Sequence, residues 1–267
     1  MRYSSFYLLI FVSSILQAIE EKHIVIVTGS YNNSVWCEAN IDSVVKQKYN
    51  NYHWIYIDDF STDNTFELVN RYINKSPIKD KVTIKQNKER CSALHNHYYA
   101  IHSCQDTDII IILDGDDFLY DENVLSYINS VYQDPNIWLT YGQFIDYPNG
   151  NIGFCCDMPQ DVVKENKFRK YVNIPSHLRT FYAGLFKRIK QEDLMLREKF
   201  YSMDADIAAM FPMIEMARDH FKFISQPLLI YNADNPINDH KVSQQLQQLL
   251  DLHIRSIQPY EKIDSPF

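Results

Sequence analysis

The first ~145 residues alternate between short apolar runs and longer amphipathic stretches, and this alternation constrains the fold more than any other feature of the chain. The short runs are rich in β-branched residues and predict strands at 23–27, 53–57, 81–85, 109–113 and 137–144. The stretches between them predict helices at about 34–47, 61–73, 92–103 and 122–133. Such alternation indicates an α/β fold, with a mostly parallel central sheet flanked by helices.

The second half of the chain is less regular. Residues 177–189 (HLRTFYAGLFKRI) predict an amphipathic helix, and residues 204–217 predict another that is interrupted at Pro212. Residues 221–232 (FKFISQPLLIYN) predict two short strands, and residues 240–257 a final amphipathic helix. We therefore expect one domain at 21–232, followed by a loop and helix extension at 233–267.

Composition narrows the partners and the redox chemistry. The chain of 267 residues carries 26 Lys and Arg against 34 Asp and Glu, a net charge of −8. Proteins that bind nucleic acid need a basic surface, so we expect no nucleic-acid partner. The five cysteines show no C-x-x-C spacing and are odd in number, so we expect mostly free thiols and at most two disulfides.

The N-terminus MRYSSFYLLIFVSSILQA has Arg2, an apolar run from Phe6 to Leu16, and then Ala18. This pattern predicts a signal peptide or signal anchor at 1–20, with an amphipathic or buried extension as the alternative. The apolar run is short for a bilayer span. We expect the secretory-pathway lumen or the periplasm, with or without membrane association through this segment; a cytoplasmic location is the alternative.

Three polar clusters follow predicted strands: TGSYNN (28–33), DDFSTDNT (58–65) and DGDD (114–117). In open parallel sheets, ligands bind beyond the carboxyl ends of the strands, so these clusters should line one crevice. For DDFSTDNT, the alternative is a loop that only caps the next helix.

The cluster DGDD places carboxylates close together, and like charges resist joint ionisation unless a cation is near. One or two carboxylates together with substrate phosphates are a typical Mg²⁺ site, and Mn²⁺ is the other candidate. The alternative is an Asp-rich turn without a ligand. A zinc site in HNHYYAIH is not expected, because His95 and His97 point apart at helical spacing.

Taken together, the clusters resemble those of the inverting family 2 glycosyltransferases of GT-A fold. IVIVTGSYN matches the first strand and nucleotide-contacting turn, IDDFSTDNT matches V-D-D-x-S-x-D-x-T, and LDGDDFL matches the metal-binding D-x-D-D. NKERCSALHNHYYAI stands where the family often has N-x-G-x-x-x-A-x-N-x-G, and here the glycines are missing. The resemblance covers roughly 23–145 and, more weakly, 177–232.

The resemblance implies a GT-A-type, Rossmann-like single domain with a C-terminal helical extension. It also implies metal-dependent, inverting transfer of a sugar from a nucleotide-sugar donor, expected to be UDP-linked. The acceptor would be a hydroxyl of a glycan, protein or lipid.

Carried over by position, the resemblance implies that the turn around Thr28 and Tyr31 contacts the base. Asp58 or Asp59 would accept a hydrogen bond from the base, and Arg90 would flank it. The complete set of expected nucleotide-sugar contacts is Thr28, Tyr31, Asp58, Asp59, Arg90, Asp114, Asp116 and Arg179.

The same resemblance implies that Asp116 holds Mn²⁺ or Mg²⁺ and that Asp114 lies near the ribose and the metal. His177 is a candidate third ligand. Asp117 is expected to brace the turn. Arg179 would grip a phosphate, or the acceptor if the acceptor is anionic; capping of a surface helix is the alternative for both His177 and Arg179.

An inverting transferase also needs a general base that takes the proton of the acceptor hydroxyl. The family uses an acid at a helix start, and YSMDADIAA offers Asp206 and, as the second choice, Asp204. The usual Glu-Asp pair is missing. Acids at helix N-termini are also common without catalytic function, since they interact favourably with the helix dipole.

Two other functions stay open. A nucleotidyltransferase would need a Gly-rich, basic phosphate loop after the first strand, which TGSYNNS lacks. A non-catalytic protein that binds sugar nucleotides or glycans is compatible with the missing Glu. The polar loop at 232–241 is expected to close over the site.

Overall fold

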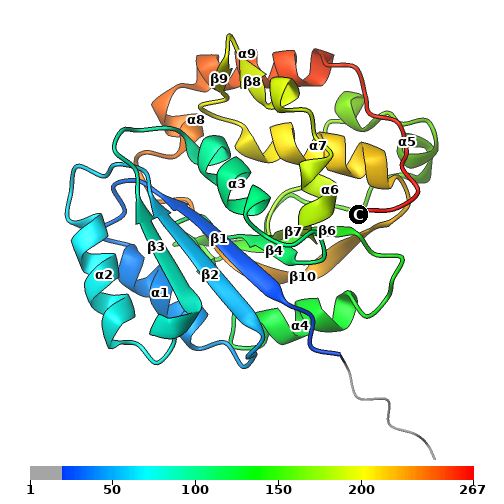
Figure 1. Ribbon diagram of the computed structural model, residues 1–267. Helices are drawn as coiled ribbons and strands as arrows, with labels where there is room; N and C mark the ends of the chain where they lie inside the picture. Colours follow the sequence, from blue (N-terminus) through cyan, green and yellow to red (C-terminus); the bar gives the residue numbers. More distant parts are fainter. Residues whose placement is uncertain (1–19) are drawn as a thin grey trace, which may run out of the picture.

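The computed structural model describes residues 20–267 (Figure 1). The predicted signal peptide or anchor therefore lies outside the described residues, apart from Glu20. Within 20–267, no helix is long and apolar enough to cross a membrane.

One eight-stranded sheet, in the order β3-β2-β1-β4-β7-β6-β10-β5, forms the centre of the molecule. Strands β1 to β4 are parallel to one another, and β6 is parallel to β10. The exceptions are β7, which is antiparallel to both β4 and β6, and the short edge strand β5. The strands are β1 (Ile24–Ser30), β2 (Tyr52–Asp58), β3 (Val82–Gln86), β4 (Ile109–Ile112), β5 (Phe118–Leu119), β6 (Leu139–Tyr147), β7 (Arg179–Tyr182) and β10 (Phe221–Asn232). A separate hairpin joins β8 (Met195–Leu196) to β9 (Lys199–Phe200).

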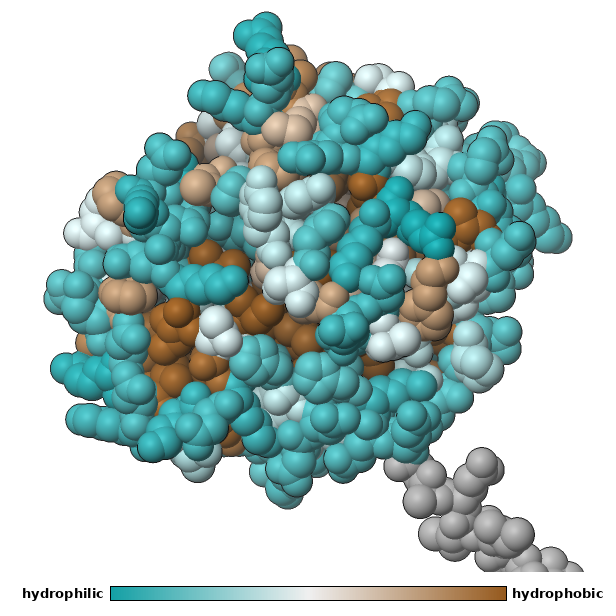
Figure 2. Space-filling model, in the orientation of Figure 1, coloured by the Kyte–Doolittle hydropathy of each residue, from teal (hydrophilic) through white to brown (hydrophobic). Residues whose placement is uncertain are grey.

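Helices cover both faces of this sheet, as Figure 1 shows: α1, α2 and α4 lie below it, while α3, α6 and α7 lie above. Helix α9 packs against α7 on the outside. The helices are α1 (Cys37–Val45), α2 (Thr65–Lys75), α3 (Ala93–His102), α4 (Val124–Val131), α5 (Gln160–Lys164), α6 (Ala183–Lys187), α7 (Ala205–Ala217), α8 (Asp239–Val242) and α9 (Gln244–Ser256). The face shown in Figure 2 is mostly hydrophilic, with hydrophobic residues visible over β2 and β3. The α/β class and the mostly parallel sheet are confirmed.

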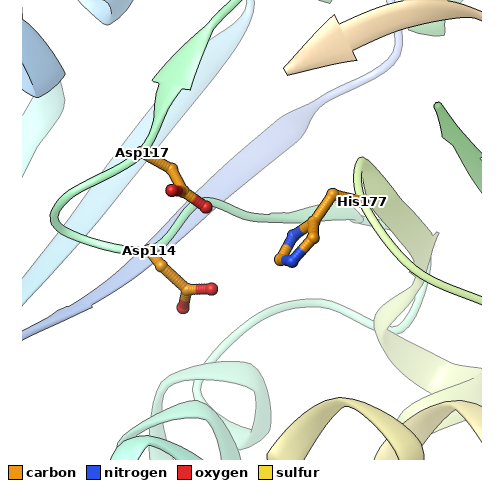
Figure 3. A group of neighbouring side chains, drawn as sticks. All are labelled: Asp114, Asp117 and His177. Atoms are coloured by element: carbon orange, nitrogen blue, oxygen red, sulfur yellow. The ribbon is translucent and has the colours of Figure 1, made fainter. Parts of the chain in front are cut away.

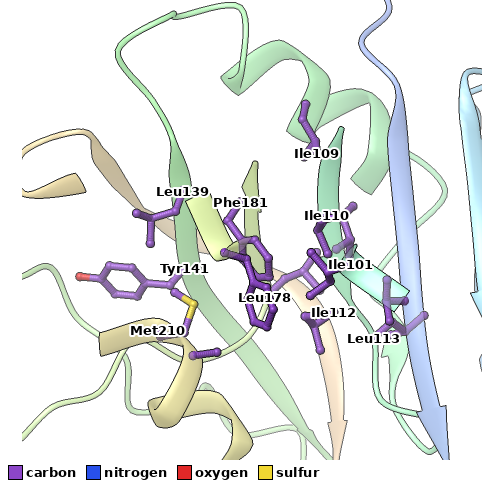
Figure 4. Close-up of a cluster of buried hydrophobic side chains, with 14 of the residues drawn as sticks. Ile101, Ile109, Ile110, Ile112, Leu113, Leu139, Tyr141, Leu178, Phe181 and Met210 are labelled. Atoms are coloured by element: carbon purple, nitrogen blue, oxygen red, sulfur yellow. The ribbon is translucent and has the colours of Figure 1, made fainter. Parts of the chain in front are cut away.

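All residues of β4 are buried, and Figure 4 shows part of the hydrophobic core around this strand. Ile110 on this strand lies near Phe181 of β7, and Tyr141 of β6 and Met210 of α7 continue the cluster. A strand that is covered on both faces needs apolar residues at every position, which is why the sequence here is a run of isoleucines.

The helix predicted at 177–189 is wrong over its first half. Residues 179–182 form strand β7, which inserts between β4 and β6, and only 183–187 are helical. Every residue of β7 is buried. The four residues Arg-Thr-Phe-Tyr show no period-2 alternation of polar and apolar side chains, so the sequence does not distinguish this short buried strand from the start of the helix that follows.

Two further expectations differ from the structure. Residues 221–232 form one strand, β10, whose pairing with β6 shifts register on both sides of Pro227. Proline has no N–H for the ladder, so it fits at such an irregularity without ending the strand. Helix α7 continues through Pro212.

All five cysteines are free.

A buried ion pair joins the C-terminal extension to the domain. Arg169 donates to both carboxyl oxygens of Glu215 on α7, at 2.7 and 2.9 Å. Its remaining Nη1 donates to the carbonyl of Ile254 on α9 (2.6 Å), and Glu215 also accepts from the backbone N–H of Tyr260. The two side chains are 3% and 0% exposed, so α7, α9 and the C-terminal tail are held together away from water.

We expect Glu215→Gln to lower the free energy of unfolding by about 3–5 kcal/mol, because it leaves the buried guanidinium of Arg169 without its counter-charge. Denaturant unfolding measures this loss. The matched control is Asp219→Asn, which removes an exposed ion pair with Lys262 and should cost no more than about 1 kcal/mol. Equal losses in the two variants would contradict the role given to the buried pair.

Candidate active site

A cavity of about 270 Å³ opens at the carboxyl ends of β1 and β4, where the sequence predicted a ligand crevice. Its polar lining comes from the turns after these strands, the loop before α3 and α3 itself, the start of β7 and the residues before it, the start of α7, the end of β10, and the segment from there into α8 and α9. The polar lining residues are Tyr31, Asn33, Arg90, His97, Asp114, Asp116, Asp117, His177, Arg179, Asp204, Asp206, Tyr231, Asn235, Asn238, Asp239 and Gln247.

The acidic turn after β4 is fixed tightly against its neighbours. A Cβ atom at Gly115 would lie 2.6 Å from the side chain of Ser30, so only glycine lets the turn approach the end of β1. Asn40 of α1 donates to the backbone carbonyls of Asp114 (3.0 Å) and Asp117 (2.7 Å). The turn therefore presents its carboxylates from a rigid backbone.

Asp114, Asp117 and His177 each place one ligand atom within 4.8 Å of the others. Figure 3 shows the two carboxyl groups and the imidazole facing a common space. Burial and the nearby charge of Arg179 lower the pKa of His177 to about 3, so the ring is neutral, as a metal ligand must be. Burial, together with the charges of Asp116 and Asp114, raises the pKa of Asp117, and its Oδ2 has no hydrogen-bond partner. Two carboxyl groups, one of them with an unpaired oxygen, and a neutral imidazole are a ligand set that fits a divalent cation.

This group overlaps the predicted ligand set of Asp114, Asp116 and His177 but is not identical to it. Asp117 belongs to the group and also braces the turn, since its Oδ1 accepts from the N–H of Asn232 (2.8 Å). Asp116 lies outside the group, and its Oδ2 accepts from the amide of Asn235 at 2.6 Å. Burial raises the pKa of Asp116 to about 6.

Arg179 connects the acidic turn to helix α7. Its Nη2 donates to Asp114 (3.1 Å) and to Nδ1 of His177 (3.2 Å), and its Nη1 lies 3.6 Å from a carboxyl oxygen of Asp206. Burial disfavours the charge of Asp114, but Arg179 outweighs this and holds the pKa of Asp114 below its usual value. The position of Arg179 at the start of β7, rather than before a helix, is what brings it beside β4.

Two of the predicted base-binding residues line the cavity and three do not. Tyr31 and Arg90 line it, and the guanidinium of Arg90 lies 3.6 Å from the centre of the Tyr31 ring. The carboxylate of Asp59 accepts from three donors of the loop before α3. Asp58 is fully buried and accepts from the N–H of Ser61.

Thr28 is also fully buried, and its hydroxyl accepts from the indole of Trp54. Thr28, Asp58 and Asp59 thus hold the surrounding loops in place in this structure and do not face the cavity. Their assignment to the nucleotide stays a prediction.

Several cavity residues were not singled out from the sequence as ligand contacts, among them Asn235 and His97. Asn235 lies in the polar loop expected to close over the site and bonds Asn33 (3.2 Å) as well as Asp116. His97 is buried, its Nε2 has no partner, and burial lowers its pKa to about 4. Neither has a local sequence signal, because each reaches the cavity only through contacts between distant segments.

The two candidate bases lie at the start of α7. Asp204 is 7% exposed; one of its oxygens accepts from Gln247 of α9 (3.0 Å), and the other has no partner. Burial raises its pKa to about 7. Asp206 is more open, with 23% of its side chain exposed beside Arg179. Both line the cavity.

The model of the glycosyl transferase family 2 matches residues 24–188, more than half of the chain. The chain belongs to this family. An uncharacterized glycosyltransferase of Haemophilus influenzae is 29% identical over 119 residues, covering 45% of this chain and 46% of that protein. The putative glycosyltransferase EpsE of Bacillus subtilis is 32% identical over 97 residues, covering 36% of this chain and 33% of EpsE. This family 2 chain thus spans less than half of the length of either relative.

Solved structures share the fold of this family 2 member. Residues 1–349 of S. aureus TarS in complex with UDP-GlcNAc superpose with a TM-score of 0.61 at 14% identity, over 83% of this chain and 61% of that one. The mannosyltransferase PcManGT from Pyrobaculum calidifontis, in complex with GDP-Man and Mn²⁺, gives 0.58 at 19% identity, over 89% of this chain and 65% of that one. The expected GT-A-type fold is confirmed.

We expect Asp204→Asn to stabilise the protein at pH 8 by about 2–4 kcal/mol. The pKa of Asp204 is raised from 3.8 to about 7 on folding, so the folded protein keeps a proton that the unfolded chain loses, and stability falls as the pH rises through this window. Urea unfolding at pH 8 and pH 5.5 measures the effect, which should shrink at the lower pH. The exposed control Asp42→Asn should show no such dependence; an equal response in both variants would contradict the assignment.

Proposed function

We propose that this protein is a divalent-metal-dependent, inverting glycosyltransferase that transfers a sugar from a nucleotide-sugar donor to an acceptor hydroxyl. The observation that carries the proposal is the cavity itself. In a family 2 fold, it gathers the acidic turn after β4, the neutral His177 and the two acids of α7.

A UDP-linked donor is the first choice. The TarS structure contains UDP-GlcNAc, whereas the PcManGT structure contains GDP-Man, so both nucleotides enter the tests. Arg90 and the ring of Tyr31 below its guanidinium offer flat groups on which either base can stack.

Asp114, Asp117 and His177 would hold Mn²⁺ or Mg²⁺, with Asp116 next to them in the turn. A divalent cation held there supplies charge stabilisation for the diphosphate leaving group. Arg179 adds a fixed positive charge to the same region and orients His177 through its Nδ1. This arrangement is preorganised, so little reorientation is needed when negative charge develops.

We propose Asp204 as the general base and Asp206 as the partner of Arg179. The resemblance to the family favours Asp206, but that carboxylate shares the charge of Arg179 with Asp114. A base is most effective when its pKa lies near the working pH, and burial brings Asp204 to about 7. Its unpartnered oxygen is available to the acceptor hydroxyl.

For the location we retain the secretory-pathway lumen or the periplasm, on the basis of the N-terminal sequence alone.

Release of UDP or GDP from a panel of nucleotide-sugars, with Mn²⁺ or Mg²⁺ and mixed acceptors, tests the activity. We expect EDTA to abolish release and Asp117→Asn to reduce it by about 100- to 1,000-fold, since the stabilisation of the leaving group is lost. Asp42→Asn serves as the matched control. Metal-dependent binding of the donor without turnover in the wild type would instead favour the non-catalytic binding protein.

The pH profile of kcat/KM tests the choice of base. We expect activity to rise with pH through about 7 in the wild type, because Asp204 must be deprotonated to accept the proton. Asp204→Asn should lose about 100- to 10,000-fold of the rate. For Asp206→Asn we expect kcat/KM still to rise with pH through about 7. If this rise is lost in Asp206→Asn and kept in Asp204→Asn, the roles of the two acids are reversed.

A further inference from the structure

The cavity has an uneven distribution of charge. Its lining contains six carboxylates, from Asp114, Asp116, Asp117, Asp204, Asp206 and Asp239. Among the described side chains that line it, the cations are Arg90 and Arg179. Which of these charges stays uncompensated when a donor is bound decides what kind of acceptor can enter.

At the donor end, a bound donor with its metal brings little net charge. A divalent cation and the diphosphate of a nucleotide-sugar carry opposite charges of similar size. Arg179 is already engaged by Asp114 and Asp206, at 3.1 and 3.6 Å. Arg90 lies on the ring of Tyr31, at the end proposed for the base.

The end formed by α7, α8 and α9 is different. It presents Asp204 and Asp239 together with the amides of Asn238 and Gln247. Lys241 lies on the same segment, but its amine donates to the carbonyls of Ala233 and Asn235 and does not line the cavity. Arg90 reaches this end only from the ring of Tyr31, where its charge opposes the effect of burial on the pKa of Asp239. Among the described side chains that line the cavity, the acids at this end therefore outnumber the cations.

Asp204 shows what this end requires of a ligand. The residue is 93% buried (7% exposed), it lines the cavity, and its Oδ2 has no hydrogen-bond partner. A carboxyl oxygen of this kind needs a donor, which a hydroxyl or an ammonium group supplies. A phosphate, sulfate or carboxylate group supplies none and adds like-charge repulsion.

We infer that the acceptor is a hydroxyl-rich group that bears no negative charge near the reacting hydroxyl: a neutral or amine-bearing sugar, not a phosphorylated, sulfated or uronic one. This inference rests on the proposed function and names the acceptor class of the same site. The inference differs from the expectation that Arg179 binds an anionic acceptor, because the guanidinium of Arg179 is paired with Asp114 and Asp206.

Methyl glycosides that differ only at C6, carrying a hydroxyl, an ammonium or a carboxylate group, provide the probe, each on gluco, galacto and manno rings. Their binding to the wild-type protein with Mg²⁺ and UDP is measured by saturation-transfer NMR, and their use as acceptors by nucleotide release. We expect the hydroxyl and ammonium forms to bind and to react at least 10-fold better than the carboxylate form. Equal responses from all three forms, including no response from any, or a preference for the carboxylate, would overturn the inference.

Asp239→Asn is expected to narrow the difference between the hydroxyl and carboxylate forms by about 3- to 10-fold, whereas Asp42→Asn leaves the ratio unchanged. An unchanged ratio in Asp239→Asn would count against the inference.

The proposed function is judged separately, by metal-dependent consumption of the donor without any acceptor. Donor consumption with no charge preference would refute only the acceptor class, and a charge preference without consumption would refute only the transferase activity.

Discussion

The crowding of like charges at the end of β4 is the constraint on which the site depends. Three aspartates within four positions cannot all ionise in a buried turn unless positive charge is brought to them. Within the protein that charge is Arg179, which reaches Asp114 from the adjacent strand β7. The antiparallel insertion of β7 between β4 and β6 is thus more than a variation in topology, because it places a guanidinium beside the acids.

The active site lowers the stability of the protein, and a buried ion pair elsewhere raises it. Asp204 and Asp117 each keep a buried oxygen without a partner, and such groups reduce stability. The buried ion pair Arg169–Glu215 has the opposite effect, because its charged groups are hydrogen-bonded. It joins α7 to α9 and so fixes the helix that begins next to Asp204. Stability lost at a functional carboxylate and stability gained at a structural one are therefore combined on a single helix.

Much of this organisation could be predicted from the sequence, because it depends on local patterns. The buried strands, the helices between them and the convergence of the polar turns follow from periodicity and from the geometry of parallel sheets. Strand β7 could not be recognised, since its four residues, Arg-Thr-Phe-Tyr, do not alternate between polar and apolar and lead directly into a helix. The grouping of Asp117 with Asp114 and His177 depends on how a four-residue turn packs against Asn40 and Ser30. Asn235 and His97 enter the cavity through long-range packing, which no local motif encodes.

The bond between Asn33 and Asn235 joins residues that are 202 positions apart, and it has a consequence for how the protein folds. Strand β10 completes the sheet between β6 and β5, and β5 directly follows the acidic turn. The final form of the turn therefore depends on a contact with the segment that follows β10. Contacts of such high sequence separation slow folding, so we expect the parallel strands β1 to β4 to pair before the site is complete.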